Sequence, residues 1–152
     1  MAERIKNIII GCDHAAFELK EKIKSYLRDN IDYKIKIEDA GTHGPESVDY
    51  PDFGIKVAMG ISSNQFERGI LLCGTGLGMS MVANKFANVR AALCNDLFSA
   101  IMSRRHNDSN VLVMGARVIG ETLAIEILKA WMGTPFEGGR HQLRIDKFNR
   151  ID

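Results

Sequence analysis

A cysteine directly precedes a glycine-rich segment in the middle of the chain. Cys73 ends an apolar run, and the next residues read Gly-Thr-Gly-Leu-Gly-Met-Ser, with glycines at 74, 76 and 78. Glycines at alternate positions expose backbone N–H groups to an anion such as a phosphate or an enediolate. A thiol beside the start of a helix usually has a lowered pKa, so Cys73 could act as a general base, assisted by the Thr75 hydroxyl. The plain alternatives are a core cysteine and a tight turn that holds no ligand.

Polar residues accompany other apolar runs as well. Asp13 and His14 follow the first run, and Arg117 comes shortly after the last one. An aspartate in this position is often only the N-cap of the next helix. Beside a histidine, it could instead move protons to a sugar oxygen or help to bind a phosphate. His106 and Asn107 offer further donors and acceptors just before the last run.

Two arginines near the end of the chain lie four residues apart. Arg140 and Arg144 would share one face of a helix and could bind a phosphate through several N–H groups. The alternative is two solvated arginines on a terminal helix. From His141 onward, only a few apolar residues stand among charged ones, which is too little apolar surface for a central core helix. We therefore expect a helical tail that packs against a partner subunit.

Short apolar runs alternate with helical patterns along the chain, and this alternation would position the polar residues. The predicted strands cover residues 5–11, 35–37, 70–73, 90–94 and 111–114. The predicted helices lie at about 16–27, 52–62, 77–87, 96–105 and 121–132. Such alternation indicates an α/β fold with a mostly parallel sheet covered by helices on both faces. Ligands of these sheets bind beyond the carboxyl ends of the strands.

The composition indicates one soluble domain. The chain has 152 residues, 45% of them hydrophobic, and its 20 Lys+Arg nearly balance its 19 Asp+Glu. A chain of about 150 residues can form one core, so we expect a single domain over 1–152. The balanced charge argues against a nucleic-acid partner, and no apolar stretch reaches the ~18 residues needed to span a membrane. The N-terminus lacks the apolar core of a signal peptide, so we expect a cytoplasmic protein.

The cysteines predict neither a disulfide framework nor a metal site. Cys12, Cys73 and Cys94 are few and widely spaced, and no histidine stands at a zinc-ligand spacing from them. We expect Cys12 and Cys94 to be buried apolar residues. The glycine segment does not match a nucleotide-binding motif either, because the last glycine of GxGxxG would fall on Met79 or Met81 and no Gly-Lys-Ser/Thr follows.

Taken together, these segments resemble the B-type ribose-5-phosphate isomerases, a family that also includes the galactose-6-phosphate isomerase subunits. The resemblance runs from about residue 7 to residue 147. It rests on six segments in order: GCDH (11–14), DYP (49–51), CGTGLG (73–78), ANK (83–85), RRHND (104–108) and GGRHQLR (138–144). It implies a Rossmann-like three-layer sandwich with five parallel strands. It also implies homodimers, or dimers of dimers, with active sites shared between subunits and with no metal or organic cofactor.

The resemblance also implies a role for each matching residue. Cys73 would move a proton between two carbons of an aldose and a ketose phosphate, with Thr75 beside it. His106 would open the furanose ring, and Asp13 would contact the sugar hydroxyls. The implied substrate-binding residues are His14, Tyr50, Gly74, Gly76, Gly78, Ser80, Asn107, Arg117, Arg140 and Arg144, with His141 a weaker addition. Asn107 would come from the partner subunit. One branch of the family uses a glutamate of the glycine loop instead of the cysteine, but this loop contains no acid.

The resulting prediction is an aldose–ketose isomerase that interconverts D-ribose 5-phosphate and D-ribulose 5-phosphate in the pentose phosphate pathway. One alternative is an isomerase of a six-carbon sugar phosphate, such as allose or galactose 6-phosphate. An alternative of another class is a regulator that binds a sugar phosphate without turnover. The cysteine, the glycine loop, the HND segment and the GGRHQ segment all occur in this one chain, which favours a self-sufficient homodimeric pentose phosphate isomerase.

Overall fold

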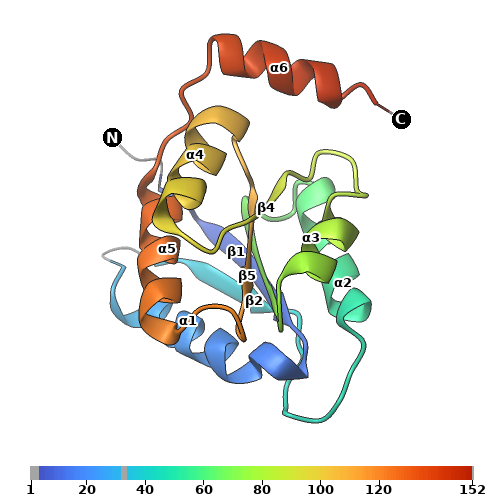
Figure 1. Cartoon of the computed structure of the whole chain (residues 1–152), viewed down its shortest axis with the longest axis vertical. Coiled ribbons are helices and arrows are strands. Elements are labelled where there is room, and N and C mark those ends of the chain that lie inside the picture. The colour runs from blue at the N-terminus through green and yellow to red at the C-terminus, as the bar shows by residue number, and fades with distance from the viewer. Residues whose placement is uncertain (1–3, 32–33, 152) are drawn as a thin grey trace.

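Five parallel strands form the sheet at the centre of the molecule, in the order β2-β1-β3-β5-β4 (Figure 1). This computed structural model describes residues 4–31 and 34–151. The strands are β1 (Asn7–Cys12), β2 (Lys36–Asp39), β3 (Arg68–Cys73), β4 (Ala91–Leu93) and β5 (Val111–Gly115). The α/β class and the five parallel strands confirm the predicted architecture. The position of β5 between β3 and β4 is a long-range pairing that the order of the elements alone does not predict.

Helices cover both faces of the sheet. One face carries α1 (Phe17–Asp29), α4 (Leu97–Asn107) and α5 (Glu121–Gly133), and the other carries α2 (Tyr50–Ser62) and α3 (Leu77–Ala83). The short 3-10 turn η1 (His14–Ala16) joins β1 to α1, and α6 (Arg140–Phe148) contacts α4. No helix in the described ranges is long and apolar enough to cross a bilayer.

Each central strand is buried on both sides, which explains its nearly continuous apolar sequence. Because side chains alternate along a strand, Ile70 and Leu72 of β3 pack beneath α1 and α5. Leu71 and Cys73 point to the opposite face, beneath α2 and α3. The side chain of Cys73 therefore lies on the same face of the sheet as the helix that follows it.

Two of the helix boundaries that differ from the predicted ones have a clear local cause. The helix expected over 52–62 already begins at Tyr50, because Pro51 fits the first turn of a helix, where its missing N–H is not needed. The helix expected over 77–87 ends at Ala83. Next to this end, the Asn84 side chain accepts a hydrogen bond from the N–H of Ala91 at 2.8 Å and donates one to its carbonyl at 2.9 Å. These bonds attach the end of α3 to the start of β4.

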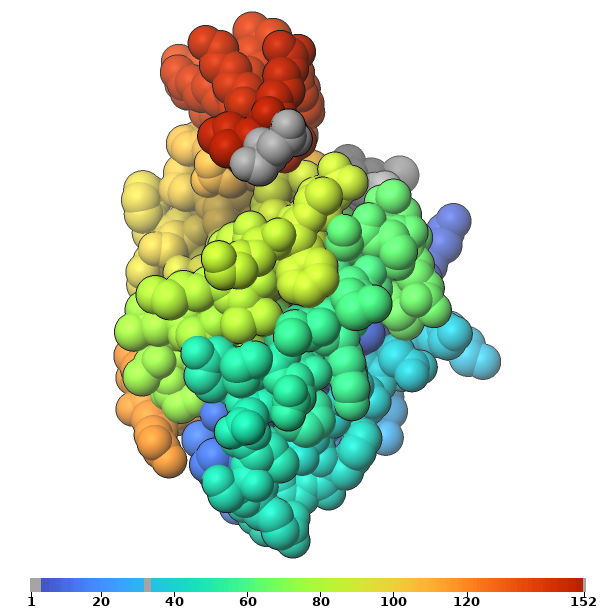
Figure 2. All heavy atoms as spheres, turned by 90° about the vertical axis from the view of Figure 1, so that its right-hand side faces the viewer, coloured from blue at the N-terminus to red at the C-terminus, as the bar shows by residue number. Residues whose placement is uncertain are grey.

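The expected helical tail is present as α6, which projects beyond the body of the molecule (Figure 2). Only His141 and Ile145 of this helix are buried. Leu143, in contrast, has a side chain that is 66% exposed. The helix is confirmed, whereas its expected packing on a partner subunit stays a prediction.

Candidate active site

Most of the candidate residues lie at the carboxyl ends of β1, β3 and β5. Because all strands are parallel, these ends share one edge of the sheet. We call this group the carboxyl-edge cluster. Its members are Asp13, His14, Tyr50, Cys73, Gly74, Thr75, Gly76, Gly78, Ser80 and Arg117. Elements far apart in the sequence therefore bring a thiol, a carboxylate, an imidazole and a guanidinium to the same edge.

Cys73 lies at the start of the glycine loop and is held by it. The Gly76 N–H donates a hydrogen bond to Sγ of Cys73 at 3.1 Å, and only 5% of the residue is exposed. Gly76 has a φ of 81°, a conformation that favours glycine, and it caps the first turn of α3. The glycine loop therefore fixes the position of the Cys73 sulfur at the carboxyl end of β3.

Close approaches explain why the loop needs glycines. A Cβ atom on Gly78 would lie 2.5 Å from Cζ of Tyr50, so the tyrosine ring covers the loop directly. A Cβ atom on Gly115 would lie 2.5 Å from the carbonyl carbon of Thr75. A Cβ atom on Gly74 would be 3.4 Å from Cδ of Arg117, which places this arginine beside the loop. The contacts bring Tyr50 and Arg117 against the segment that follows Cys73.

Some expected backbone donors are already in use. The Ser80 N–H donates to the Gly76 carbonyl at 3.1 Å, and its hydroxyl donates to the Leu77 carbonyl at 2.7 Å. The Gly76 N–H points to sulfur. In this structure the turn of α3 and the thiol take these protons, and the expected role of Ser80 and Gly76 toward an enediolate stays a prediction. The backbone amides of Gly74 and Gly78 remain the candidate donors.

Asp13 and His14 occupy the loop after β1. Oδ1 of Asp13 accepts the Ala15 N–H at 3.0 Å, so this aspartate is an N-cap, as one interpretation of the sequence predicted. The other carboxylate oxygen can still accept a hydrogen bond from a ligand. Nδ1 of His14 accepts the Val48 N–H at 3.1 Å. A neutral His14 therefore carries its proton on Nε2, which makes that nitrogen a donor suited to an anion.

A buried lysine supports this loop and was not singled out from the sequence. Lys20 is 0% exposed, and its Nζ donates to Oδ1 of Asp39 at 2.6 Å and to the Thr42 carbonyl at 2.5 Å. Burial disfavours the Asp39 carboxylate, but the hydrogen bonds from Lys20 and Lys24 outweigh it and lower the pKa of Asp39 to about 2. Thr42 in turn donates its N–H to the carbonyl of Cys12 at 2.8 Å, beside Asp13.

The other two cysteines behave as the sequence predicts. Cys12 and Cys94 are buried, on the face of the sheet opposite the Cys73 side chain. Burial raises the pKa of both thiols to about 11. Both are therefore protonated at neutral pH, and we assign them to the core.

Four candidate residues lie at the opposite edge of the sheet. The helix α4 starts after the carboxyl end of β4 and returns to the amino end of β5, so its last residues are at the amino edge (Figure 1). The chain after α5 ends at the same edge and continues into α6. We call this group the amino-edge cluster: His106, Asn107, Arg140 and Arg144. One chain thus keeps the two clusters at opposite ends of its sheet.

A buried network fixes the end of α4. Arg104 donates to Oδ1 of Asp108 at 2.8 Å and to the Ser109 carbonyl at 2.6 Å. Asp108 adopts a left-handed conformation with a φ of 44° and also accepts a hydrogen bond from Arg90 at 3.1 Å. Nε1 of Trp131 donates to Oγ of Ser109 at 2.8 Å. These bonds hold the turn that carries His106 and Asn107.

The structure places His141 and Glu137 beside His106. Its ring stacks on the ring of His141, with centroids 4.2 Å apart and planes within 9° of each other. Oε2 of Glu137 lies 3.5 Å from Nε2 of His141 and 4.0 Å from Nε2 of His106. Burial lowers the pKa of His141, and the neighbouring His106 and the positive charge of Arg140 lower it further. Glu137 was not among the residues predicted from the sequence, although it lies four residues before His141.

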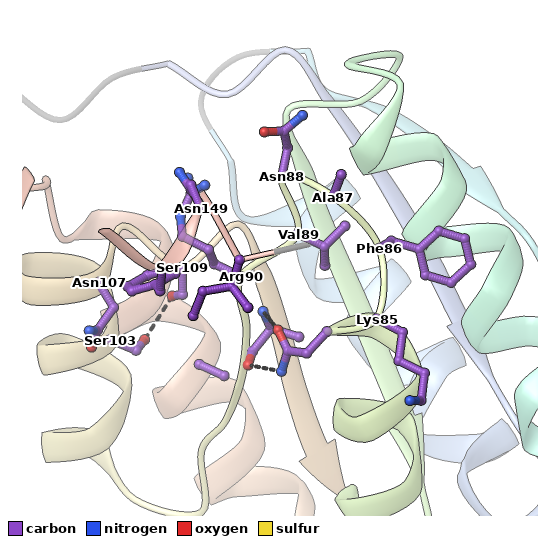
Figure 3. Close-up of a pocket in the computed structure, with 15 residues that line it drawn as sticks. Lys85, Phe86, Ala87, Asn88, Val89, Arg90, Ser103, Asn107, Ser109 and Asn149 are labelled. Carbon is purple, nitrogen blue, oxygen red and sulfur yellow. Dashed lines mark hydrogen bonds between the residues drawn. The ribbon is translucent and has the colours of Figure 1, made fainter. Parts of the chain in front are cut away.

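A cavity of about 610 Å³ opens on the amino-edge side of the molecule (Figure 3). It lies between the segment 84–92, the end of α4 and the residues at the end of α6, and it is lined by Lys85, Arg90, Asn107 and Asn149 among others. It contains none of the carboxyl-edge residues. The cavity therefore belongs to the surface around Asn107 and is separate from the carboxyl-edge cluster.

Comparisons with known proteins agree on one family. The family model described as ribose/galactose isomerase matches residues 8–148. The chain is 44% identical to the ribose-5-phosphate isomerase B of Escherichia coli, over 97% of each chain. It is 43% identical to a D-erythrulose-4-phosphate isomerase of Pectobacterium atrosepticum, over 93% of this chain and 91% of the relative. The crystal structure of a ribose 5-phosphate isomerase from Thermotoga maritima superposes with a TM-score of 0.91 at 50% identity, covering 98% of this chain and 100% of that one.

Proposed function

Because the chain belongs to the ribose/galactose isomerase family, we propose that it interconverts D-ribose 5-phosphate and D-ribulose 5-phosphate. The observation that carries the proposal is the position of Cys73. This cysteine is the last residue of β3, and its sulfur accepts a hydrogen bond from the glycine loop. Two relatives of high identity are named for this activity. The catalytic unit that we propose is the single domain 1–152, acting in the cytoplasm.

The proposed reaction moves one proton between neighbouring carbons. The Cys73 thiolate takes the proton from C2 of the open aldose, and the electron pair moves through C1 to the carbonyl oxygen. The resulting enediolate is stabilised by backbone N–H groups; removing one such donor in comparable sites costs about 3 kcal/mol. The Cys73 thiol then gives its proton to C1, while the proton of the C2 hydroxyl passes to the oxygen on C1. The product is the ketose, and the thiolate is regenerated.

The remaining carboxyl-edge residues bind the two ends of the sugar in this proposal. Asp13 accepts hydrogen bonds from sugar hydroxyls, and Thr75 stands beside the reacting carbons. His14 and Arg117 face the phosphate with an Nε2–H donor and a guanidinium. Binding energy from the phosphate orients the open-chain sugar although it lies far from the bond changes.

The second half of the site comes from a partner subunit in this proposal. The amino-edge cluster lies at the far end of the sheet within one chain (Figure 1). A homodimer, alone or paired into a tetramer, would place the partner subunit's His106 and Asn107 beside the sugar. The partner subunit's Arg140 and Arg144, four residues apart on α6, would complete the phosphate site. The projection of α6 from the body supports this arrangement (Figure 2).

His106 opens the sugar ring in this scheme, so its loss should separate two steps. His106→Asn is expected to lower net turnover of ribose 5-phosphate by about 100-fold, the lower end of general acid–base effects. Ribulose 5-phosphate has no ring to open, so exchange of its C1 hydrogen with D₂O should be largely retained. Proton NMR measures both rates. Equal losses of exchange and turnover would contradict the ring-opening role.

The chemistry uses side chains and backbone only, so chelation should leave it intact. We expect that exhaustive dialysis against a chelator does not lower the rate at which the protein converts ribose 5-phosphate. Appearance of the ketose carbonyl follows the reaction, and wild-type protein dialysed without chelator is the control. Loss of activity that added divalent metal restores would show that the proposed mechanism is wrong.

The length of the sugar is the point on which relatives differ. The Pectobacterium atrosepticum relative is named for erythrulose 4-phosphate, a four-carbon ketose phosphate. An isomerase of a six-carbon sugar phosphate uses the same proton transfer. A regulator without turnover would have no use for the Cys73–Gly76 contact, because phosphate binding alone requires no base. We therefore keep the pentose phosphate as substrate and treat the other sugars as competitors in the test.

A further inference from the structure

Three metal-ligating side chains meet where α6 packs on α4. His106 comes from α4, His141 comes from α6, and Glu137 comes from the connection between α5 and α6. Each offers one ligand atom, and these atoms lie within 4.8 Å of one another. The Glu137 N–H donates to the Arg105 carbonyl at 3.1 Å, which attaches the connection to the end of α4. Glu137 and His141 lie four residues apart in the sequence, and the packing of α6 on α4 brings His106 beside them.

The separations suit a bridging metal better than direct hydrogen bonds. Oε2 of Glu137 is 3.5 Å from Nε2 of His141 and 4.0 Å from Nε2 of His106, beyond the usual range of hydrogen bonds. Two ligands of a tetrahedral zinc ion, with bonds of about 2.1 Å, are about 3.4 Å apart. The two rings, now within 9° of parallel, need to tilt toward Glu137 for both nitrogens to face one ion.

The ligand set indicates which ions would bind. Two imidazoles and one carboxylate with an open fourth position are a ligand set of three-ligand zinc sites. Magnesium and calcium prefer oxygen ligands and would bind poorly. Nε of Arg105 lies 3.7 Å from Oε1 of Glu137, and this positive charge makes the site weaker than a structural zinc site. A weak site fits an ion that binds and leaves.

We propose that His106, Glu137 and His141 form a binding site for zinc or a similar divalent transition metal, and that an ion bound there inhibits the enzyme. The inhibitory part rests on the proposed function, because the ion coordinates Nε2 of His106, the residue that opens the sugar ring in the proposed reaction. The binding part rests on the cluster alone. The metal is thus an inhibitor and not a cofactor.

The decisive variant removes the carboxylate, which has no role in the proposed reaction. Chelator-treated wild type should bind one zinc ion per chain in equilibrium dialysis, and Glu137→Gln should bind it at least ~10-fold more weakly. Glu126→Gln is the matched control, since Glu126 is an exposed glutamate paired only with Lys129 among the described residues. It should bind zinc as the wild type does. Circular dichroism verifies that all variants are folded.

A second variant separates this site from the reactive thiol. Cys73→Ala should bind zinc with unchanged affinity, and its cobalt complex should lack the near-ultraviolet charge-transfer band of a thiolate ligand. Zinc binding that disappears in Cys73→Ala, or that persists unchanged in Glu137→Gln, would overturn the site. No measurable binding by the wild type would also overturn it.

Activity tests the inhibitory part. Zinc should lower ribose 5-phosphate turnover of the wild type and of Glu126→Gln, while Glu137→Gln should keep its metal-free rate and need at least ~10-fold more zinc for the same inhibition. Inhibition equal in all three would refute this part. If metal-free wild type does not turn over ribose 5-phosphate, the proposed function fails, and dialysis still decides whether the site exists.

Discussion

Replacing Cys73 by alanine is expected to reduce isomerisation of ribose 5-phosphate by at least ~1,000-fold. General acid–base groups contribute about 100- to 10,000-fold, and here one sulfur serves both carbons. Cys73→Ser should lose activity as well, because a serine hydroxyl is far too weak an acid to supply a base at neutral pH. Binding of the sugar phosphate should persist in both variants, since its phosphate contacts lie on other residues. Steady-state kinetics and titration calorimetry measure the two properties separately.

Cys94→Ala provides the matched control for this experiment. Cys94 is a buried thiol on the opposite face of the sheet, and its pKa is raised to about 11 by burial. Its loss should change stability slightly and leave turnover within a few-fold of the wild type. Undiminished turnover by Cys73→Ala would show that Cys73 is not the base of the reaction, whatever the result of the binding measurement.

Mixing two inactive variants is expected to restore activity. Each proposed site combines the carboxyl-edge cluster of one chain with the amino-edge cluster of its partner. A chain with Cys73→Ala and a chain with both Arg140→Ala and Arg144→Ala are then each inactive alone. In a mixed dimer, one of the two sites contains no substitution, so random pairing restores about a quarter of all sites by two-fold symmetry. Turnover after subunit exchange measures the recovery.

A different pair of variants shows whether the recovery reports shared sites. Cys73 and Arg117 both belong to the carboxyl-edge cluster, and Arg117 lies against the glycine loop. Mixing Cys73→Ala with Arg117→Ala should therefore restore nothing, because every site keeps one substitution. Recovery by this control pair, or none by the first pair once mixed dimers have been isolated, would contradict a site built from two subunits.

The sequence predicted the elements of the fold better than their arrangement. The apolar runs at 70–73 and 111–114 indicate buried strands, and both strands are present at nearly these positions. The place of β5 between β3 and β4 depends on pairing between distant segments, which periodicity does not encode. Pro51 ends up inside the first turn of α2, so the helix starts earlier than the apolar pattern suggests.

For the candidate site too, the sequence predicted which residues take part better than it predicted where the fold places them. Residues that end or directly follow strands, such as Cys73 and Asp13, could be placed at one edge because parallel strands end together. Lys20 could not be predicted as buried, since its burial depends on Asp39 and the Thr42 carbonyl, which approach it only in the folded chain. The separation of His106 from Cys73 by the length of the sheet likewise follows from the path of α4, and not from residue types.

One assay tests the central proposal most directly: turnover of four-, five- and six-carbon aldose phosphates by the purified wild-type protein. We expect D-ribose 5-phosphate to give D-ribulose 5-phosphate with the highest kcat/KM of the set. Saturable binding of every sugar phosphate without formation of any ketose would contradict the account, and a clear preference for another chain length would contradict the substrate that we assign.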